Sequence, residues 1–129
     1  MNIAFVTPEG RTRTPIELTS IHTIRTLAMD AVQGVCARVV SMPSWELFDD
    51  QDSDYRTSVL PLHVKARVSV EEASDFGWTR YTGTDGQNIG IETFGASAPI
   101  KQLLKKFGFT ADHIVAAAKN QLARHRSRD

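Results

Sequence analysis

The chain has 129 residues, which fits one domain with a useful core. Fifteen basic and fifteen acidic residues balance to a net charge of zero, which argues against a surface dedicated to nucleic acid or to an anionic membrane. Cys36 is the single cysteine, and this excludes an intrachain disulfide and a metal site built from cysteines.

The start of the sequence, MNIAFVTPEG, lacks the basic segment and the long apolar core of a signal peptide. No apolar run in the chain is long enough to span a membrane. We therefore expect a cytoplasmic protein.

The first third of the chain predicts a strand, a helix and a second strand. Apolar residues favour a short strand over Asn2–Thr7. A helical period of apolar residues runs over Glu17–Gln33, and Gly34 offers a stop. The run Val35–Ser41 is rich in β-branched residues and indicates a buried strand of a parallel sheet.

The middle of the chain alternates in the same way. Trp45–Asp50 indicates a helical turn and Gln51–Leu60 a further helix that Pro61 ends. Apolar residues alternate over Lys65–Glu71, as in a strand. No regular element is predicted over Glu72–Gly86.

The stretch from Asn88 to Thr110 reads as a strand, a small-residue loop, a helix and a helix stop. Gly108 can adopt the left-handed conformation that ends a helix, and Thr110 can cap the last helix. The helix before Gly108 has one apolar face, which consists of Ile100, Leu103, Leu104 and Phe107. If this face is buried, Phe107→Ala should destabilise the fold by about 3–5 kcal/mol.

Strands that alternate with helices predict an α/β domain with a mostly parallel sheet that is covered on both faces.

An aspartate cluster precedes the predicted helix Gln51–Leu60. Asp50, Asp52 and Asp54 match the first three ligand positions of an EF-hand, but Tyr55 and Pro61 stand where its glycine and its glutamate belong. The better interpretation is that these carboxylates cap and charge the start of the helix.

Other residues that often carry chemistry are isolated. Cys36 lies in an apolar strand without a nearby base, which favours a buried structural thiol. Four histidines are scattered without metal-ligand spacing and are expected at the surface or at helix ends. They are His22, His63, His113 and His125.

Two patterns leave alternatives open. Gly95, Ser97 and Ala98 lie in a loop that opens a helix at Pro99, so the loop can be an anion site or can serve tight packing of helix on strand. It lacks the lysine of a P-loop. Four aromatic residues can form a binding surface, or can be core or interface anchors. They are Trp45, Phe76, Trp78 and Tyr81.

From about residue 37 to about residue 122, the chain resembles the C-terminal domain of transketolase. Many separate blocks match in the right order, which makes the resemblance specific to this family. The blocks include Arg38–Asp49, Ala66–Glu71, Phe76–Trp78, Thr93–Pro99, Lys106–Thr110 and Val115–Lys119.

The resemblance implies a three-layer α/β/α domain with a mostly parallel, mixed sheet of four to five strands. Transketolases move a two-carbon ketol unit between sugar phosphates in the pentose phosphate pathway, with thiamine diphosphate and Mg²⁺ or Ca²⁺. In that family the cofactor, the metal and the catalytic residues belong to two preceding domains. The resemblance therefore assigns no catalytic, cofactor-binding or metal-binding residue to this chain.

The resemblance also divides the chain. Residues 37–123 form the transketolase-like domain, and residues 124–129 form a charged tail. Residues 1–36 diverge from the family pattern, with Val6–Gly10 where an Ala-Thr-Gly-Ser-Glu turn is usual. They either supply an equivalent strand and helix or are a replaced N-terminus.

The leading hypothesis is a detached or split C-terminal domain with a structural or assembly role that is inactive alone. Its expected partners are the transketolase cofactor domains or a second copy of itself, with no nucleic acid and no membrane. The alternative is a regulatory module that binds a phosphorylated metabolite at the Gly95–Pro99 loop.

Overall fold

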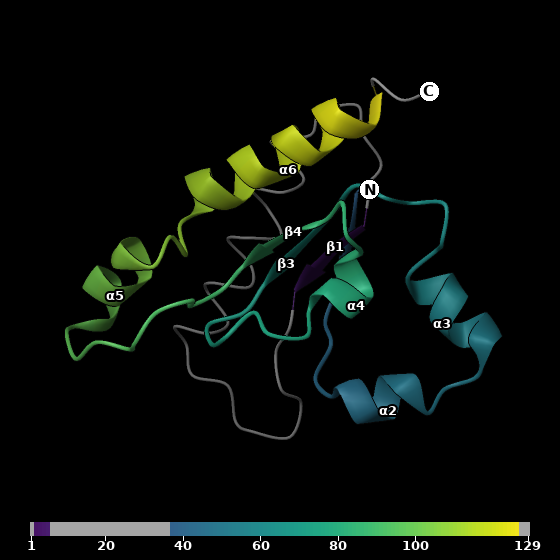
Figure 1. The fold of residues 1–129 in the computed structure, drawn as a ribbon, viewed down its shortest axis with the longest axis horizontal. Helices are drawn as coiled ribbons and strands as arrows, with labels where there is room; N and C mark the ends of the chain where they lie inside the picture. The colour runs from purple at the N-terminus through teal and green to yellow at the C-terminus, as the bar shows by residue number, and fades with distance from the viewer. Residues whose placement is uncertain (1, 6–36, 127–129) are drawn as a thin grey trace.

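The computed structural model describes residues 2–5 and 37–126 (Figure 1). The helix predicted over residues 17–33, its stop at Gly34, and the interpretations of His22 and Cys36 lie outside the described residues.

The described strands form one four-stranded sheet in the order β2-β1-β3-β4. All three pairings are parallel. The strands are β1 (Asn2–Phe5), β2 (Arg38–Val40), β3 (Arg67–Val70) and β4 (Gln87–Ile89). Each lies within or beside a predicted strand, and β1 takes an inner position between β2 and β3. β1 is the strand that one interpretation of residues 1–36 expects, whereas the helix of that interpretation lies outside the described residues.

Five helices are described: α2 (Trp45–Asp49), α3 (Ser53–Val59), α4 (Thr79–Thr82), α5 (Ile100–Lys106) and α6 (Ala111–Arg126). Four of them were predicted, whereas α4 lies in the stretch where no regular element was expected. α6 runs to Arg126, so residues 124–126, which were assigned to the tail, are helical. No helix in the described part of the chain combines the length and the apolarity needed to cross a membrane.

Two polar side chains fix where α2 and α3 begin. The Oγ of Ser44 accepts a hydrogen bond from the backbone N–H of Leu47 (3.2 Å), and Oδ1 of Asp52 accepts one from Tyr55 (2.7 Å). Each bond satisfies a backbone donor that a helix start leaves free. The capping interpretation is confirmed for Asp52.

Helices cover both faces of the sheet, as a three-layer α/β/α domain requires. One core cluster joins α6 to β3 and β4, and Figure 1 shows α6 running along that side of the sheet. It consists of Val68, Val70, Ile89, Ile114, Ala117 and Ala118. A second cluster consists of Val40, Met42, Leu60, Trp78 and Tyr81. The neighbours Val39 and Val40 pack against the first and the second cluster respectively, so the clusters lie on opposite faces.

The apolar face of α5 is less buried than the sequence predicts. α5 contains no buried residue, and Ile100 is 46% exposed. Residues 92–99, all exposed, connect β4 to this helix, which lies beyond the end of the sheet (Figure 1). The helix itself ends as predicted, because Gly108 follows it with φ +79°.

Candidate functional site

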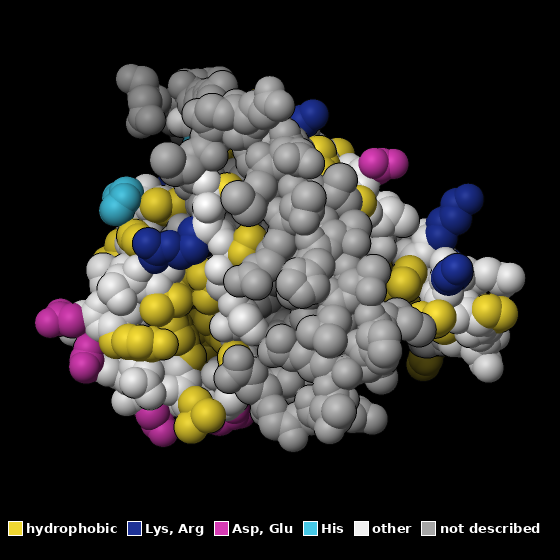
Figure 2. All heavy atoms as spheres, turned by 180° about the vertical axis from the view of Figure 1, so that it is seen from behind, with side chains coloured by type: hydrophobic (Ala, Val, Ile, Leu, Met, Phe, Trp, Pro, Cys, Tyr) yellow, Lys and Arg dark blue, Asp and Glu magenta, His cyan; other side chains and the backbone are white. Residues whose placement is uncertain are grey.

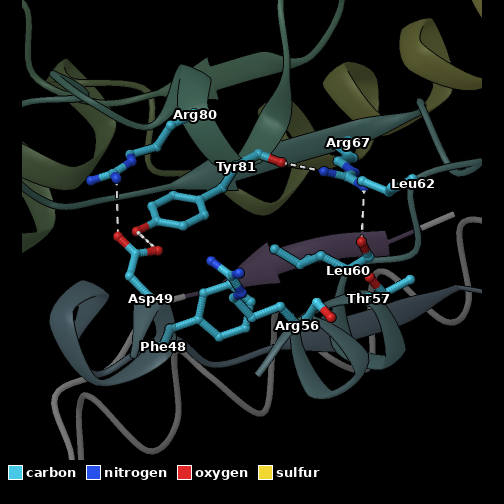
Figure 3. Close-up of a pocket in the computed structure, with 10 residues that line it drawn as sticks. Phe48, Asp49, Arg56, Thr57, Leu60, Leu62, Arg67, Arg80 and Tyr81 are labelled. Carbon is cyan, nitrogen blue, oxygen red and sulfur yellow. Dashed lines mark hydrogen bonds and ion pairs between the residues drawn. The ribbon is translucent and has the colours of Figure 1, made fainter. Parts of the chain in front are cut away.

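A cleft of about 370 Å³ lies between α2, α3 and α4 (Figure 3). Ten described residues line it, and three of them are arginines: Arg56 of α3, Arg67 of β3 and Arg80 of α4. Asp49 of α2 is the one carboxylate among these ten. The cleft therefore carries an excess of positive charge.

Asp49 is already engaged by two partners. Its Oδ2 lies 3.0 Å from Nη2 of Arg80, and its Oδ1 accepts a hydrogen bond from the Tyr81 hydroxyl at 3.2 Å. Burial of the Tyr81 ring, followed by the negative charge of Asp49, raises the pKa of Tyr81 to about 12. The Tyr81 hydroxyl is thus a hydrogen-bond donor at neutral pH and does not act as a base.

Arg67 holds three parts of the chain together through backbone carbonyls. Its Nε donates to Val64 (2.9 Å), its Nη2 donates to Pro61 (2.8 Å), and its Nη1 donates to Tyr81. Burial lowers the pKa of Arg67 from its very high ordinary value, but arginine remains charged at neutral pH. The carbonyls satisfy its donors without neutralising its charge.

The aromatic residues pack mainly inside the domain. The Trp45 and Trp78 ring centroids lie 5.3 Å apart with an interplanar angle of 88°, and Tyr81 contacts both rings. Trp78 is fully buried and Tyr81 is 5% exposed, so the interpretation as core anchors is confirmed for these two. Phe76, by contrast, is 86% exposed.

The predicted loop at Gly95, Ser97 and Ala98 is exposed along its whole length. A Cβ added to Gly95 would meet no atom within 4 Å. The prediction of tight packing at this glycine is therefore wrong. Pro99 precedes α5 without a side-chain cap, and α5 has only seven residues. The anion site at this loop stays a prediction.

The remaining predicted residues do not come together. Asp52 caps α3, His63 is exposed, and the Nδ1 atom of His113 lies 2.8 Å from the carbonyl oxygen of Gly108. Within residues 2–5 and 37–126, no three His, Cys, Asp or Glu side chains are placed to hold a metal ion.

Two exposed phenylalanines, Phe76 and Phe94, follow the carboxyl ends of neighbouring strands, and of these the sequence analysis named only Phe76. Phe76 follows β3 and Phe94, which is 98% exposed, follows β4. The two loops are joined, because the N–H of Ile91 donates to the carbonyl of Ala73 at 2.7 Å. We call Phe76 and Phe94 the aromatic edge. Periodicity gave no signal for Phe94, because it lies in an irregular loop.

Hydrophobic side chains also reach the surface near α5. Seen from behind, the α5 end of the molecule shows them beside lysines (Figure 2). Ile100 of α5 is exposed, and so are Lys101, Lys105 and Lys106 of the same helix. Apolar exposure is thus found on α5 as well as on the two loops that carry Phe76 and Phe94.

Comparison with known proteins gives a consistent answer. A family model described as a transketolase-like C-terminal domain matches residues 19–110. The chloroplastic transketolase of Solanum tuberosum is 53% identical over 87 residues, which are 67% of this chain and 12% of that protein.

Solved structures agree with the sequence matches. The transketolase of Leishmania mexicana superimposes with a TM-score of 0.77 at 34% identity, over 95% of this chain and 16% of that one. A second structure is described as "Split gene transketolase, inactive beta4 tetramer", where beta4 refers to its subunits. It shares the fold with a TM-score of 0.60 at 21% identity, over 95% of this chain and 39% of that one.

The family model covers more than half of the chain, and the sheet and its covering helices superimpose on a transketolase over nearly the whole chain. The resemblance stated from the sequence is therefore confirmed. The chain spans only a small part of the length of the curated relatives it matches. It belongs to the family of transketolase-like C-terminal domains.

Proposed function

We propose that this chain serves as the C-terminal domain of a transketolase-type enzyme, with a structural or assembly role and no catalysis of its own. The observation that carries the proposal is the superposition on the Leishmania mexicana transketolase, which uses 95% of this chain but 16% of that protein. A fold that makes up so small a part of an enzyme is one domain of that enzyme. The catalytic residues and the cofactor would lie in the other domains.

In this proposal the ketol transfer between sugar phosphates, and its place in the pentose phosphate pathway, belong to the complete enzyme. Thiamine diphosphate and its Mg²⁺ or Ca²⁺ would be held by other domains. No catalytic step is assigned to this chain.

The aromatic edge supplies the contact surface that an assembly role needs. Exposed phenylalanines are costly to hydrate, and burying two such side chains contributes roughly 3–6 kcal/mol to association. Phe76 and Phe94 are 86% and 98% exposed on loops that are tied to each other. We assign the cofactor domains of the enzyme as the occupant of this surface, since the matched relatives are several times longer than this chain.

Activity and binding by the isolated chain test the proposal. The purified chain is mixed with thiamine diphosphate, magnesium and a ketose donor, and both calorimetric heat and ketol transfer are measured. We expect neither a binding isotherm nor product. Turnover above the buffer blank would overturn the proposal.

The chain is either a separately encoded subunit or a piece of one longer polypeptide. The split-gene structure shows only that a transketolase of that description shares this fold. Neighbouring reading frames decide between the two forms, because a split enzyme needs cofactor domains encoded elsewhere. A genome without such domains would remove the split form.

The proposal places the chain in the cytoplasm, although the potato relative is described as chloroplastic. Fractionation of cells that express the tagged chain tests this placement. The alternative of a regulatory module at Gly95–Pro99 is not favoured, because the comparisons identify transketolases and the loop shows no built site.

A further inference from the structure

Arg56 carries a charge that no described acidic residue neutralises. It lies on α3, and its side chain reaches into the cleft (Figure 3). The one carboxylate among the ten described lining residues, Asp49, is paired with Arg80 at 3.0 Å. The guanidinium of Arg56 is therefore available to a ligand.

Arg67, on the opposite wall of the cleft, is a second cation for which the described residues supply no carboxylate partner. Among the residues that the structure describes, it donates four hydrogen bonds, all to backbone carbonyls, those of Leu60, Pro61, Val64 and Tyr81. Carbonyl dipoles satisfy its donors but leave a net positive charge in a half-buried position. The lowered pKa of Arg67 has the same cause, namely the removal of this charge from water.

The remaining walls suit an anion that carries a small organic group. Ser53 and Thr57 place hydroxyl groups at the cleft, and hydroxyls donate readily to phosphate oxygens. Phe48, Leu60 and Leu62 supply apolar surface. A volume of about 370 Å³ lies at the lower end of the range of small-molecule sites.

We propose that the cleft between α2, α3 and α4 is a binding site for a small phosphate monoester, which Arg56 contacts directly. Arginine is suited to this class of ligand, because its planar fork of donors matches two phosphate oxygens. Arg67 and Arg80 add positive potential, and Asp49 opposes it. The site is separate from the Gly95–Pro99 loop, which contributes none of the lining residues. Ligand binding in the cleft is also independent of the proposed assembly role.

Titration of the full chain tests the site. Glycerol 3-phosphate is the probe and glycerol is the uncharged control, both at constant ionic strength, with amide chemical shifts and tryptophan fluorescence as readouts. Trp45 reports on the cleft, because its ring lies 5.6 Å from that of Tyr81. We expect saturable shifts in α2, α3 and α4 with the phosphate ester and none with glycerol.

Three variants of single charges sharpen the test. Arg56→Gln removes the proposed contact from an exposed side chain, and we expect at least about tenfold weaker binding. Asp49→Asn removes the opposing charge, and we expect tighter binding. Lys105→Gln removes an equal charge from α5 and is expected to leave the affinity unchanged.

Two results would overturn the proposal. One is a linear, unsaturated response of the wild-type chain to glycerol 3-phosphate. The other is an equal loss of affinity in Arg56→Gln and Lys105→Gln, because equal losses indicate attraction by the overall charge without a specific cleft contact. Failure of the chain to assemble with transketolase cofactor domains would not change the result of the glycerol 3-phosphate titration.

Discussion

The ring of Trp45 occupies the space that a side chain on Gly77 would need. A Cβ built on Gly77 would lie 2.8 Å from Cζ3 of Trp45, and the residue has φ +91°. The absence of a side chain at Gly77 thus lets α2 lay its tryptophan across the edge of Trp78. Through this contact Trp45 packs against the second core cluster, and two residues of that cluster, Leu60 and Tyr81, line the cleft.

We predict that Gly77→Ala destabilises the fold more than Gly83→Ala. Both glycines have positive φ, which costs an alanine about 1–3 kcal/mol, but a Cβ on Gly83 meets no atom within 4 Å. The collision with Trp45 adds about 1–3 kcal/mol at Gly77. Urea denaturation of the two variants measures the difference. Equal losses would show that Trp45 moves aside without cost.

A second pair of variants tests the exposure of α5. Phe107, the C-cap residue of α5, and Phe109 are both partly buried, but of the two only Phe109 packs against the cluster formed by β3, β4 and α6. We predict that Phe109→Ala lowers the free energy of unfolding by about 2–3 kcal/mol and that Phe107→Ala lowers it by about 1 kcal/mol. This value for Phe107 replaces the 3–5 kcal/mol expected from the sequence. A loss of 3 kcal/mol or more at Phe107 would restore the original expectation.

Stability at high pH depends on Tyr81. Its pKa is raised to about 12, above the ordinary value of about 10, so the folded chain keeps a proton that the unfolded chain releases between these values. The stabilisation is complete below about pH 10 and is lost as the pH rises through about 12. The loss in free energy of unfolding amounts to about 2–3 kcal/mol.

Absorbance titration at the phenolate band checks this prediction. The chain has two tyrosines, so the variant Tyr81→Phe isolates the contribution of Tyr81. We expect this variant to lack the late-titrating phenol and to lose less stability over the same pH range. If Tyr81→Phe leaves the alkaline decline unchanged, Tyr81 is not its source.

The aromatic edge is expected to matter for assembly and not for folding. Phe76→Ser and Phe94→Ser remove exposed side chains, so each should change the stability of the isolated chain by less than about 0.5 kcal/mol. In a complete enzyme that contains this chain as its C-terminal domain, the same variants should lower the melting temperature. Leu47→Ser, at an exposed leucine of α2, is the matched control. An equal effect of all three variants would remove the assignment.

Much of the fold follows from local sequence, and the omissions have physical causes. Apolar alternation and β-branched or apolar runs predicted each described strand near its position, and the acidic residues that include Asp52 predicted the start of α3. α4 was missed because four residues are too few to display a helical period, and because its anchor Trp78 lies among turn residues. The period of α5 predicted the helix correctly, but the same period arises whether or not another element covers its apolar face.

The candidate site was beyond sequence reasoning for a different reason. Arg56, Arg67 and Arg80 lie on three separate elements, and only the tertiary fold brings them to one cleft. A single arginine in a sequence is ordinarily a solvated charge. The sequence alone also does not show that Asp49 pairs with Arg80 and that no acidic residue of the described part pairs with Arg56.

The most direct test of the central claim is ketol transfer by a chimera. The C-terminal domain of the potato transketolase is replaced with this chain, which is 53% identical to that enzyme over 87 residues. The references are the intact potato enzyme and the same enzyme truncated before its C-terminal domain. We predict activity within about tenfold of the intact enzyme, or about 1.4 kcal/mol in the activation free energy. A folded chimera no more active than the truncated enzyme would contradict the assignment of this chain as a working transketolase C-terminal domain.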